Sequence, residues 1–112
     1  LPVLSPLYQL DYLQQTLRTL NAEQRQALKL KVREQLDALQ QELNQTNPDV
    51  KVFHRMIGSM GQLGLLRLSQ LCQLTEKQLL QQERHDPLLL HQLQLCLHQT
   101  QQAIEQLFTA TD

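Results

Sequence analysis

Apolar residues recur at intervals of three and four along most of this chain. Between residues 28 and 43 they are Leu28, Val32, Leu36, Leu39 and Leu43. At about 3.6 residues per turn these positions share one face of an α-helix, whereas a half-buried strand needs an apolar residue at every second position. Aromatic residues make up only 4% of the chain, and its few β-branched residues do not alternate with polar ones. We therefore predict an all-α protein.

Local signals mark where the first two helices begin. Ser5-Pro6 and Asp11 each offer a start for a first helix that runs to about Leu20. The stretch from Asn21 to Gln24 has the spacing of a capping box, in which the side chains of the first and fourth residues bond each other's backbone N–H groups. This box predicts a second, long helix that contains the apolar stripe.

Two prolines mark the later helices. Asn47 is expected to cap a third helix, with Pro48 as its first helical residue, and this helix ends near Gly64. Asp86-Pro87 repeats the signal and opens a fifth helix, which leaves a fourth between them. The predicted core faces of the fourth and fifth helices are Leu65, Leu68, Leu71, Cys72, Thr75 and Leu79, and Leu89, Leu93, Cys96, Leu97, Thr100, Ile104 and Leu107. Because short loops join antiparallel neighbours, we predict an antiparallel up-and-down four-helix bundle with a short extra N-terminal helix.

The length of 112 residues fits one domain. Residues 1–10 read as a linker remnant or an N-terminal cap, and residues 11–112 as the bundle domain. Since the first residue is not methionine, we expect a domain taken from a longer protein. The net charge of −1 gives no basic surface for nucleic acid. No apolar run approaches the ~20 residues that span a bilayer, so we also expect no membrane contact by this domain.

Cysteine and histidine give little sign of a metal site. Cys72 and Cys96 occupy apolar helical positions and suit the core of a protein in a reducing compartment, although a disulfide between them stays open. His91 and His98 lie two helical turns apart, and no carboxylate or thiol completes a ligand set with them or with His85. We therefore expect no bound metal.

The segment from His54 to Gly64 departs from the leucine-rich pattern. Its core-facing stripe in a helix consists of Phe53, Met56, Met60 and Leu63. His54, Gly58 and Gly61 fall together on the other side. A glycine inside a helix costs about 0.8–1 kcal/mol relative to alanine, so two on one exposed face need a reason. A face without side chains next to a histidine lets another macromolecule approach the imidazole closely.

The same segment resembles the signature of histidine-containing phosphotransfer (HPt) domains, the relay modules of multi-step two-component signalling. That signature is roughly His-x-Leu-Lys-Gly-Ser-x-x-x-Leu-Gly-Ala, followed by another leucine and often a Leu-Cys pair. His54 stands at the position of the phosphoacceptor. The further matches are Met56, Gly58-Ser59, Leu63-Gly64, Leu68 and Leu71-Cys72. The predicted helix order agrees with the resemblance, since the family places its histidine midway along the third helix of a bundle.

The resemblance implies a phosphorelay intermediate of two-component signalling. His54 would accept a phosphoryl group from the aspartate of a response-regulator receiver domain, in cis or in trans, and pass it to another receiver. Ile57, Gly58 and Gly61 would form the face on which the receiver docks. The receiver would bring the Mg²⁺, so this chain would bind no cofactor and would not be an enzyme on its own.

The resemblance also implies a setting for the domain. The parent would be a hybrid sensor histidine kinase anchored in a bacterial membrane, with this domain in the cytoplasm and monomeric when isolated. The chain has no Gly-rich nucleotide loop and no acidic Mg²⁺-binding motif. Kinase activity within the chain itself is therefore not expected.

The segment differs from the family signature at two positions. The lysine three residues after the histidine is Ile57 here, and the alanine after the second glycine is Leu65. The family's lysine is thought to help neutralise the phosphoryl group. Lys51, Arg55 and Arg67 are the candidates to replace its charge, and the sequence does not choose among them.

Plainer interpretations stay open. Gly58 and Gly61 would also suit close helix–helix packing, and Gly64 suits a helix C-cap. The whole chain would then be a non-catalytic bundle for docking or dimerisation, with a degenerate HPt motif. The exposure of His54 separates the two functions, because a relay needs an accessible imidazole and a docking bundle does not.

Overall fold

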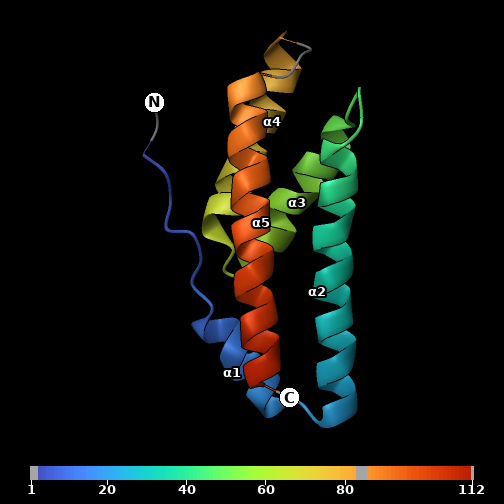
Figure 1. Ribbon diagram of the computed structural model, residues 1–112, viewed down its shortest axis with the longest axis vertical. Helices are drawn as coiled ribbons and strands as arrows, with labels where there is room; N and C mark the ends of the chain where they lie inside the picture. The colour runs from blue at the N-terminus through green and yellow to red at the C-terminus, as the bar shows by residue number, and fades with distance from the viewer. Residues whose placement is uncertain (1–2, 83–85, 112) are drawn as a thin grey trace.

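The computed structural model describes residues 3–82 and 86–111, and this part of the chain forms five helices and no strand (Figure 1). The helices are α1 (Asp11–Thr19), α2 (Ala22–Leu43), α3 (Val50–Gln62), α4 (Leu66–Gln82) and α5 (Pro87–Ala110). The all-α prediction is confirmed. None of these helices is long and apolar enough to cross a membrane.

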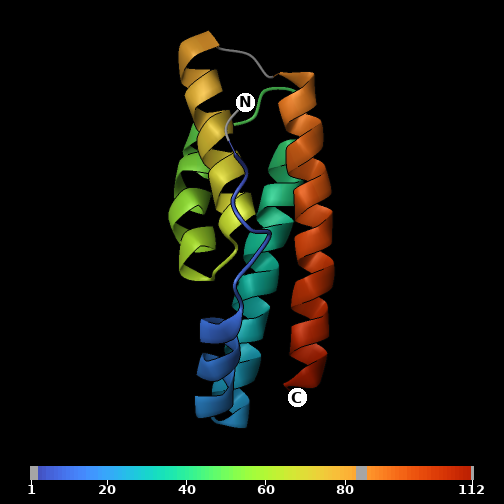
Figure 2. The same ribbon diagram turned by 90° about the vertical axis from the view of Figure 1, so that its left-hand side faces the viewer.

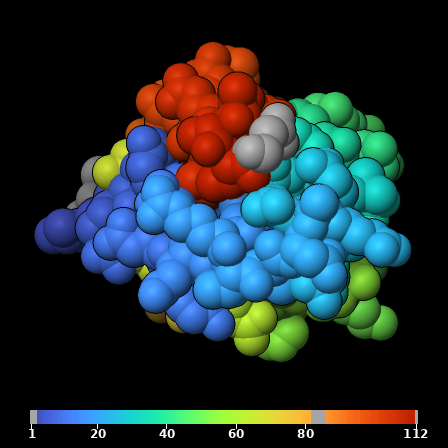
Figure 3. Space-filling view, turned by 90° about the horizontal axis from the view of Figure 1, so that it is seen from below, coloured from blue at the N-terminus to red at the C-terminus, as the bar shows by residue number. Residues whose placement is uncertain are grey.

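Helices α2 to α5 enclose a common core. α2 packs against α3 and α5, and α4 packs against the same two helices, so the contacts close a ring. The shorter α3 lies in the upper half of the bundle in Figure 1, while α2 and α5 run along most of its length. α1 lies at the lower end, and Figure 3 shows this end with α1 and the start of α2 next to the end of α5. The chain is therefore a helical bundle.

Side-chain caps start α2 and α5 as predicted. Asn21 Oδ1 accepts from the N–H of Gln24 at 2.8 Å, and Gln24 Oε1 accepts from the N–H of Asn21 at 3.1 Å, which completes the capping box of α2. Asp86 caps α5 ahead of Pro87, and its carboxylate accepts from the N–H of Leu88 at 2.9 Å. Both starts were predictable because a cap and its partner lie within three residues of each other.

The predicted start of the third helix is wrong. α3 is capped by Asp49 rather than Asn47, and Pro48 precedes the helix instead of opening it. The Asp49 carboxylate accepts from the N–H of Lys51 at 2.9 Å, which places the cap two residues later than the proline signal indicated. The N–H of Asp49 donates to the carboxylate of Glu42 at the end of α2. This contact between helices fixes the cap and cannot be derived from the local pattern.

Residues 3–10 form an extended strap along α4 and α5 (Figure 2). The first helix accordingly begins at Asp11 and not at Ser5-Pro6, although it ends at Thr19, close to the predicted position. The hydrogen bonds of the strap join Ser5 N to Gln70 Oε1 (2.6 Å), Arg67 Nε to Ser5 O (3.0 Å), Gln70 Nε2 to Val3 O (3.0 Å) and Gln9 N to Gly64 O (2.7 Å). Backbone groups bound in this way are not available to a helical ladder.

Gly64 ends α3, as predicted, directly after the cap residue Leu63. Its φ is +80°, and the N–H of the next residue, Leu65, donates to Met60 O at 2.9 Å. Residues with a Cβ rarely adopt this φ. A Cβ at this position would also lie 1.8 Å from Gln9 O of the strap. Glycine is therefore required both by the turn and by the close approach of the strap.

The core follows the predicted stripes except at positions toward the ends of the helices. The predicted positions that are only partly buried are Leu28, Leu63, Leu79, Leu89 and Leu107. Lys29 is buried next to Leu28, at 1% exposure, and Phe108 is buried next to Leu107. Lys29 Nζ donates to Phe108 O at 2.8 Å and lies 5.7 Å from the centre of the Phe108 ring. The carbonyl and the ring face stabilise an ammonium group that apolar spacing alone would leave outside.

Cys72 and Cys96 are buried free thiols, which confirms them as core residues. Burial raises the pKa of the Cys72 thiol to about 12. Burial also raises the pKa of the Cys96 thiol. Both thiols are protonated at neutral pH, and because the thiolate is the reactive form, they serve as packing groups.

Candidate functional site

His54 lies midway along α3 and points away from the core. Phe53, Met56 and Met60 are buried as predicted and fix which face of α3 is turned inward. This leaves the His54 side chain 76% exposed. The structure therefore presents the imidazole to solvent from a rigid helical segment.

Glu76 of α4 holds one nitrogen of the His54 ring. His54 Nδ1 lies 2.6 Å from Glu76 Oε2, and the Glu76 side chain is 19% exposed. A carboxylate can only accept a hydrogen bond, so Nδ1 carries the proton in this contact. In the neutral ring the lone pair then belongs to Nε2. The contact thus orients the ring and leaves Nε2 as its nucleophilic atom.

Two contacts fix how α3 and α4 are aligned. His54 lies opposite Glu76, while seven residues further along α3 a Cβ on Gly61 would lie 3.6 Å from Ser69 Oγ. Ser69, seven residues before Glu76, also donates to the carbonyl of Ile57 at 2.7 Å. The two helices therefore run in opposite directions, and their exposed edges form one seam. We call this edge, with His54, Ile57 and Gly61 on α3 and Ser69 and Glu76 on α4, the α3–α4 seam.

The packing explanation for the glycines is wrong for Gly58. A Cβ at Gly58 would have no atom within 4 Å, so nothing in the described bundle needs a glycine there. At Gly61 a Cβ would make an ordinary van der Waals contact with Ser69. Both residues are exposed on the same side of α3 as His54. The bundle therefore leaves the space next to the imidazole unfilled, and a binding partner can enter it.

Ile57 lies on the seam but is only partly exposed. Its side chain packs against the edge of the core. The carbonyl of Ile57 accepts the Ser69 hydroxyl, which couples this turn of α3 to α4. Part of the Ile57 side chain is thus available for an external contact one turn from His54.

The three candidate cations fall in different places. Lys51 and Arg55 are exposed on α3, at about 60° and 100° around the helix from His54. Arg67 is half-buried on α4, and its Nε donates to Ser5 O of the strap at 3.0 Å. The structure brings Lys51 and Arg55 to the surface of the histidine's own helix and holds Arg67 against the strap.

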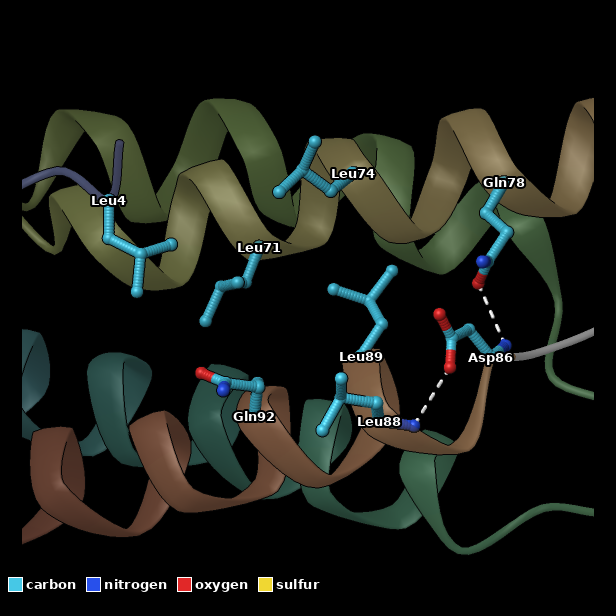
Figure 4. A pocket seen from close by; sticks show the side chains of 8 residues that line it. All are labelled: Leu4, Leu71, Leu74, Gln78, Asp86, Leu88, Leu89 and Gln92. Atoms are coloured by element: carbon cyan, nitrogen blue, oxygen red, sulfur yellow. Dashed lines mark hydrogen bonds between the residues drawn. The ribbon is translucent and has the colours of Figure 1, made fainter. Parts of the chain in front are cut away.

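Neither of the larger grooves of the bundle includes His54. One, of about 600 Å³, lies between α2 and α3 and is bordered by charged residues that include Lys31, Glu34 and Arg55. The other, of about 300 Å³, lies between α4, α5 and the strap, and Figure 4 shows its leucines facing one another with Gln78 and Asp86 at one end. The leucines of this groove are Leu4, Leu71, Leu74, Leu88 and Leu89. His54 lies outside both grooves, on the exposed surface of α3.

His91 and His98 do not join the site. His91 and His98 are exposed on α5. His85 lies outside the described residues. Within residues 3–82 and 86–111 no group of three or more His, Cys, Asp or Glu side chains is arranged to hold a metal ion.

Glu76 is the residue that the sequence interpretation missed. It stands 22 residues after His54, so no helical spacing links the two. A usable signal existed in the turn between α3 and α4, since His54 and Glu76 are equally far from Leu65 in sequence. Antiparallel helices joined by a tight turn bring such symmetric positions together.

Comparisons with models of protein families, with curated proteins and with solved structures found no match. The HPt resemblance therefore rests on the matching residues between His54 and Cys72 and on the order of the helices.

Proposed function

We propose that this chain is a phosphorelay module of the HPt type. In this proposal α2 to α5 form an antiparallel up-and-down four-helix bundle with α1 as the short extra helix. His54 accepts a phosphoryl group from the aspartyl phosphate of a receiver domain and donates it to another receiver. The observation that carries the proposal is the His54–Glu76 contact of 2.6 Å, because a neutral ring that donates from Nδ1 has its lone pair on Nε2, and the side chain is 76% exposed.

The transfer step balances without any group beyond the two proteins. The Nε2 lone pair of His54 attacks phosphorus, the N–P bond forms, and the P–O bond to the aspartyl carboxyl breaks. The electron pair leaves with the aspartate, which becomes a carboxylate. The ring keeps its Nδ1 proton and becomes a cation bonded to phosphate. Transfer to the second receiver reverses these bond changes on a new aspartate.

Glu76 supports this step in two ways. Its carboxylate accepts the Nδ1–H and so selects the form of the ring in which Nε2 is nucleophilic. It also stabilises the positive charge that develops on the ring as the N–P bond forms, and a hydrogen bond to a charged group contributes about 1.5–3 kcal/mol. Glu76 is thus a positioning residue that acts through the Nδ1 proton.

The residues around His54 give a partner access to Nε2 and supply positive charge near the phosphoryl group. The open space at Gly58 lets the rim of a receiver site reach Nε2. Lys51 and Arg55 supply positive charge on the same helix surface and take the part of the family lysine, whose position is occupied by Ile57. The receiver brings Mg²⁺, which offsets the charge on the transferring phosphoryl group. We further propose that the parent is a hybrid sensor histidine kinase and that the domain works in the cytoplasm as a monomer.

The second candidate is a docking bundle without phosphotransfer. The observation that favours it is the missing lysine of the family signature, whose position is occupied by Ile57. In that case the chain binds a receiver but takes no phosphate from it.

A labelling experiment separates the two candidates. The chain is incubated with several receiver domains that carry radiolabelled phosphate, and in parallel with phosphoramidate, a small donor that needs no docking surface. We expect label on the wild-type chain that is lost in acid and survives base, as a phosphohistidine requires. His54→Gln should take no label from either donor while its circular dichroism stays unchanged.

The matched control is His98→Gln, which removes an exposed histidine from α5. It should be labelled like the wild type. Wild-type chain that binds receivers but stays unlabelled by all donors would contradict the relay and support the docking bundle.

A further inference from the structure

The strap shows what kind of segment the apolar groove of about 300 Å³ between α4 and α5 can hold. The side-chain amide of Gln70 bonds the strap backbone on both sides of Leu4. Its Nε2 donates to Val3 O at 3.0 Å, and its Oε1 accepts from Ser5 N at 2.6 Å. One residue of a neighbouring parallel β-strand would bond the same two backbone groups. Gln70 therefore recognises an extended backbone through groups that every such segment offers.

The contact with Gln70 also decides which side chain enters the groove. Leu4 lies between the two bonded groups and lines the groove beside Leu71 (Figure 4). Val3, the next residue along the strap, is 91% exposed. Consecutive side chains of an extended chain point to opposite sides. A segment bound in this way therefore places every second side chain in the groove.

The strap is anchored separately at its other end. Leu7 and Leu10 pack against the core, and Gln9 N donates to Gly64 O at 2.7 Å. Residues 3–5 lie further along α4 and are held there by hydrogen bonds to side chains. The strap thus runs opposite to α4. Segments with few buried apolar contacts open at a low cost in free energy, so residues 3–5 can leave the groove while the anchored end stays.

The groove is larger than the side chain that the strap puts into it. Beyond Leu4 it continues along α4 to Leu74 and Gln78, and on the α5 side Leu88 is still 61% exposed (Figure 4). From Leu71 to Gln78 the helix rises about 10 Å. Alternate side chains of an extended chain lie about 7 Å apart. The groove therefore has length for a second apolar side chain, two positions before the one at Leu4.

The charge of the groove restricts the occupant further. Asp86 is the one charged side chain among the described residues that line the groove. Its carboxylate accepts from Leu88 N at 2.9 Å and caps α5, while its own N–H donates to Gln78 Oε1 at 2.8 Å. A charged side chain placed among these leucines would lose water without gaining a partner. The chemistry of the groove thus suits an uncharged segment.

We propose that this groove binds an extended, uncharged segment of another protein that carries large apolar side chains at two alternate positions. The segment replaces residues 3–5 of the strap, bonds Gln70 through its backbone and places its additional apolar side chain against Leu74 and Leu88. The strap is then a competitor within the same chain. This binding site is separate from His54 and does not depend on the proposed relay function.

The test uses the full chain and an acetylated peptide, Leu-Val-Leu-Ser-Pro, with a fluorophore at its C-terminus. The peptide repeats residues 3–6 after an added leucine. Fluorescence anisotropy measures its affinity. Wild-type chain should bind it weakly, because a tethered competitor acts at an effective concentration of the order of millimolar. Leu4→Gln weakens that competitor and should bind the peptide about tenfold more tightly. A peptide with glutamine at both leucine positions should bind this variant at least about tenfold more weakly than the original peptide.

Two further substitutions in the Leu4→Gln chain locate the site. Leu88→Gln should weaken peptide binding about tenfold, because it removes an apolar wall of the groove. The matched control is Leu30→Gln, which replaces a leucine of α2 that is 57% exposed and should leave the affinity unchanged. Gln70→Ala should weaken binding as well, since it removes both backbone contacts. Circular dichroism checks that each variant keeps its helices.

Several results would overturn the inference. These are no binding of the peptide to Leu4→Gln, equal affinities for the leucine and glutamine peptides, and equal effects of Leu88→Gln and Leu30→Gln. Hydrogen exchange of the Ser5 amide, which bonds Gln70 Oε1, should speed up when the peptide binds wild-type chain, and unchanged exchange would contradict displacement of the strap. Sedimentation that shows a wild-type dimer which Leu4→Gln abolishes would assign the groove to the strap of a second copy instead.

Discussion

The lower end and the upper half of the bundle use basic side chains in opposite ways. At the lower end Lys29 is 1% exposed, donates to Phe108 O and lies over the Phe108 ring. In the upper half His54 is 76% exposed, and its contact with Glu76 engages only Nδ1. A charge that is buried among its partners contributes to the fold. A ring held by one nitrogen and open at the other leaves that second nitrogen accessible to a partner.

The same contrast separates the glycines. Gly64 is needed by the chain itself, because of its positive φ and the strap carbonyl that would meet a Cβ. Gly58 is needed by nothing in the described bundle. A helical glycine lowers stability, and its presence next to His54 fits the access that the proposed function requires.

Loss of the buried cation should have the largest effect on stability. Lys29→Ala removes the hydrogen bond to Phe108 O and leaves a cavity, so the free energy of unfolding should fall by about 2–4 kcal/mol. Urea denaturation followed by circular dichroism measures this. Lys31→Ala, at an exposed position on the same helix, should stay within about 0.5 kcal/mol of the wild type. Similar losses of unfolding free energy in both variants would show that buried Lys29 stabilises the fold no more than an exposed lysine does.

The glycine contrast can be tested by the same substitution at two positions. Gly64→Ala should lower the free energy of unfolding by about 2–3 kcal/mol, because alanine resists the left-handed conformation and the strap must move. Gly58→Ala should raise it by about 0.5–1 kcal/mol, since alanine favours a helix and meets no neighbour. Thermal and urea unfolding of the two variants give the comparison. A loss of stability in Gly58→Ala would mean that the site is packed and not open.

Replacement of the residue that holds the ring should slow transfer without unfolding the chain. Glu76→Gln keeps a group that can bond Nδ1 but removes the negative charge, so labelling at saturating donor should slow by at least about tenfold. The rate should fall with phosphoramidate as well as with a receiver, because Glu76 acts on the ring itself and not on docking. Glu34→Gln, exposed on α2, is the control. Unchanged labelling rates in Glu76→Gln would show that the charge of Glu76 has no role in transfer.

The smallest expected effect concerns an exposed ion pair near the lower end. Arg33 Nε donates to Glu105 Oε1 at 2.7 Å, and this hydrogen bond lowers the pKa of the Glu105 carboxyl. A carboxyl with a lowered folded-state pKa stabilises the fold above its unfolded pKa, and this contribution is lost as the pH falls through the folded pKa. Both side chains are well exposed, so the loss should stay below about 1 kcal/mol.

The measurement is urea unfolding of wild type and Glu105→Gln at pH 7 and at acid pH. The difference between the two chains should shrink as the pH falls through the folded-state pKa of Glu105. A difference that grows toward acid pH would contradict the assigned direction.

The sequence by itself determined the helical class and much of the element layout. Spacing of three and four residues predicts a helix because it reflects the helical period. The capping box at Asn21 and the cap at Asp86 were predictable because cap and partner are within one turn. The same reasoning identified His54 as a residue on the outward face of α3, since Phe53 and Met56 fix the inward face.

Tertiary structure decided what these local patterns leave free. The cap of α3 moved to Asp49, and Arg67 bonds the strap, because their partners come from distant segments. Lys29 is buried because the end of α5 supplies a carbonyl and an aromatic ring. Glu76 reaches His54 only through the alignment of two antiparallel helices. A sequence pattern reports the neighbours of a residue within about two turns, whereas the partner that orients the His54 ring depends on how whole helices pack.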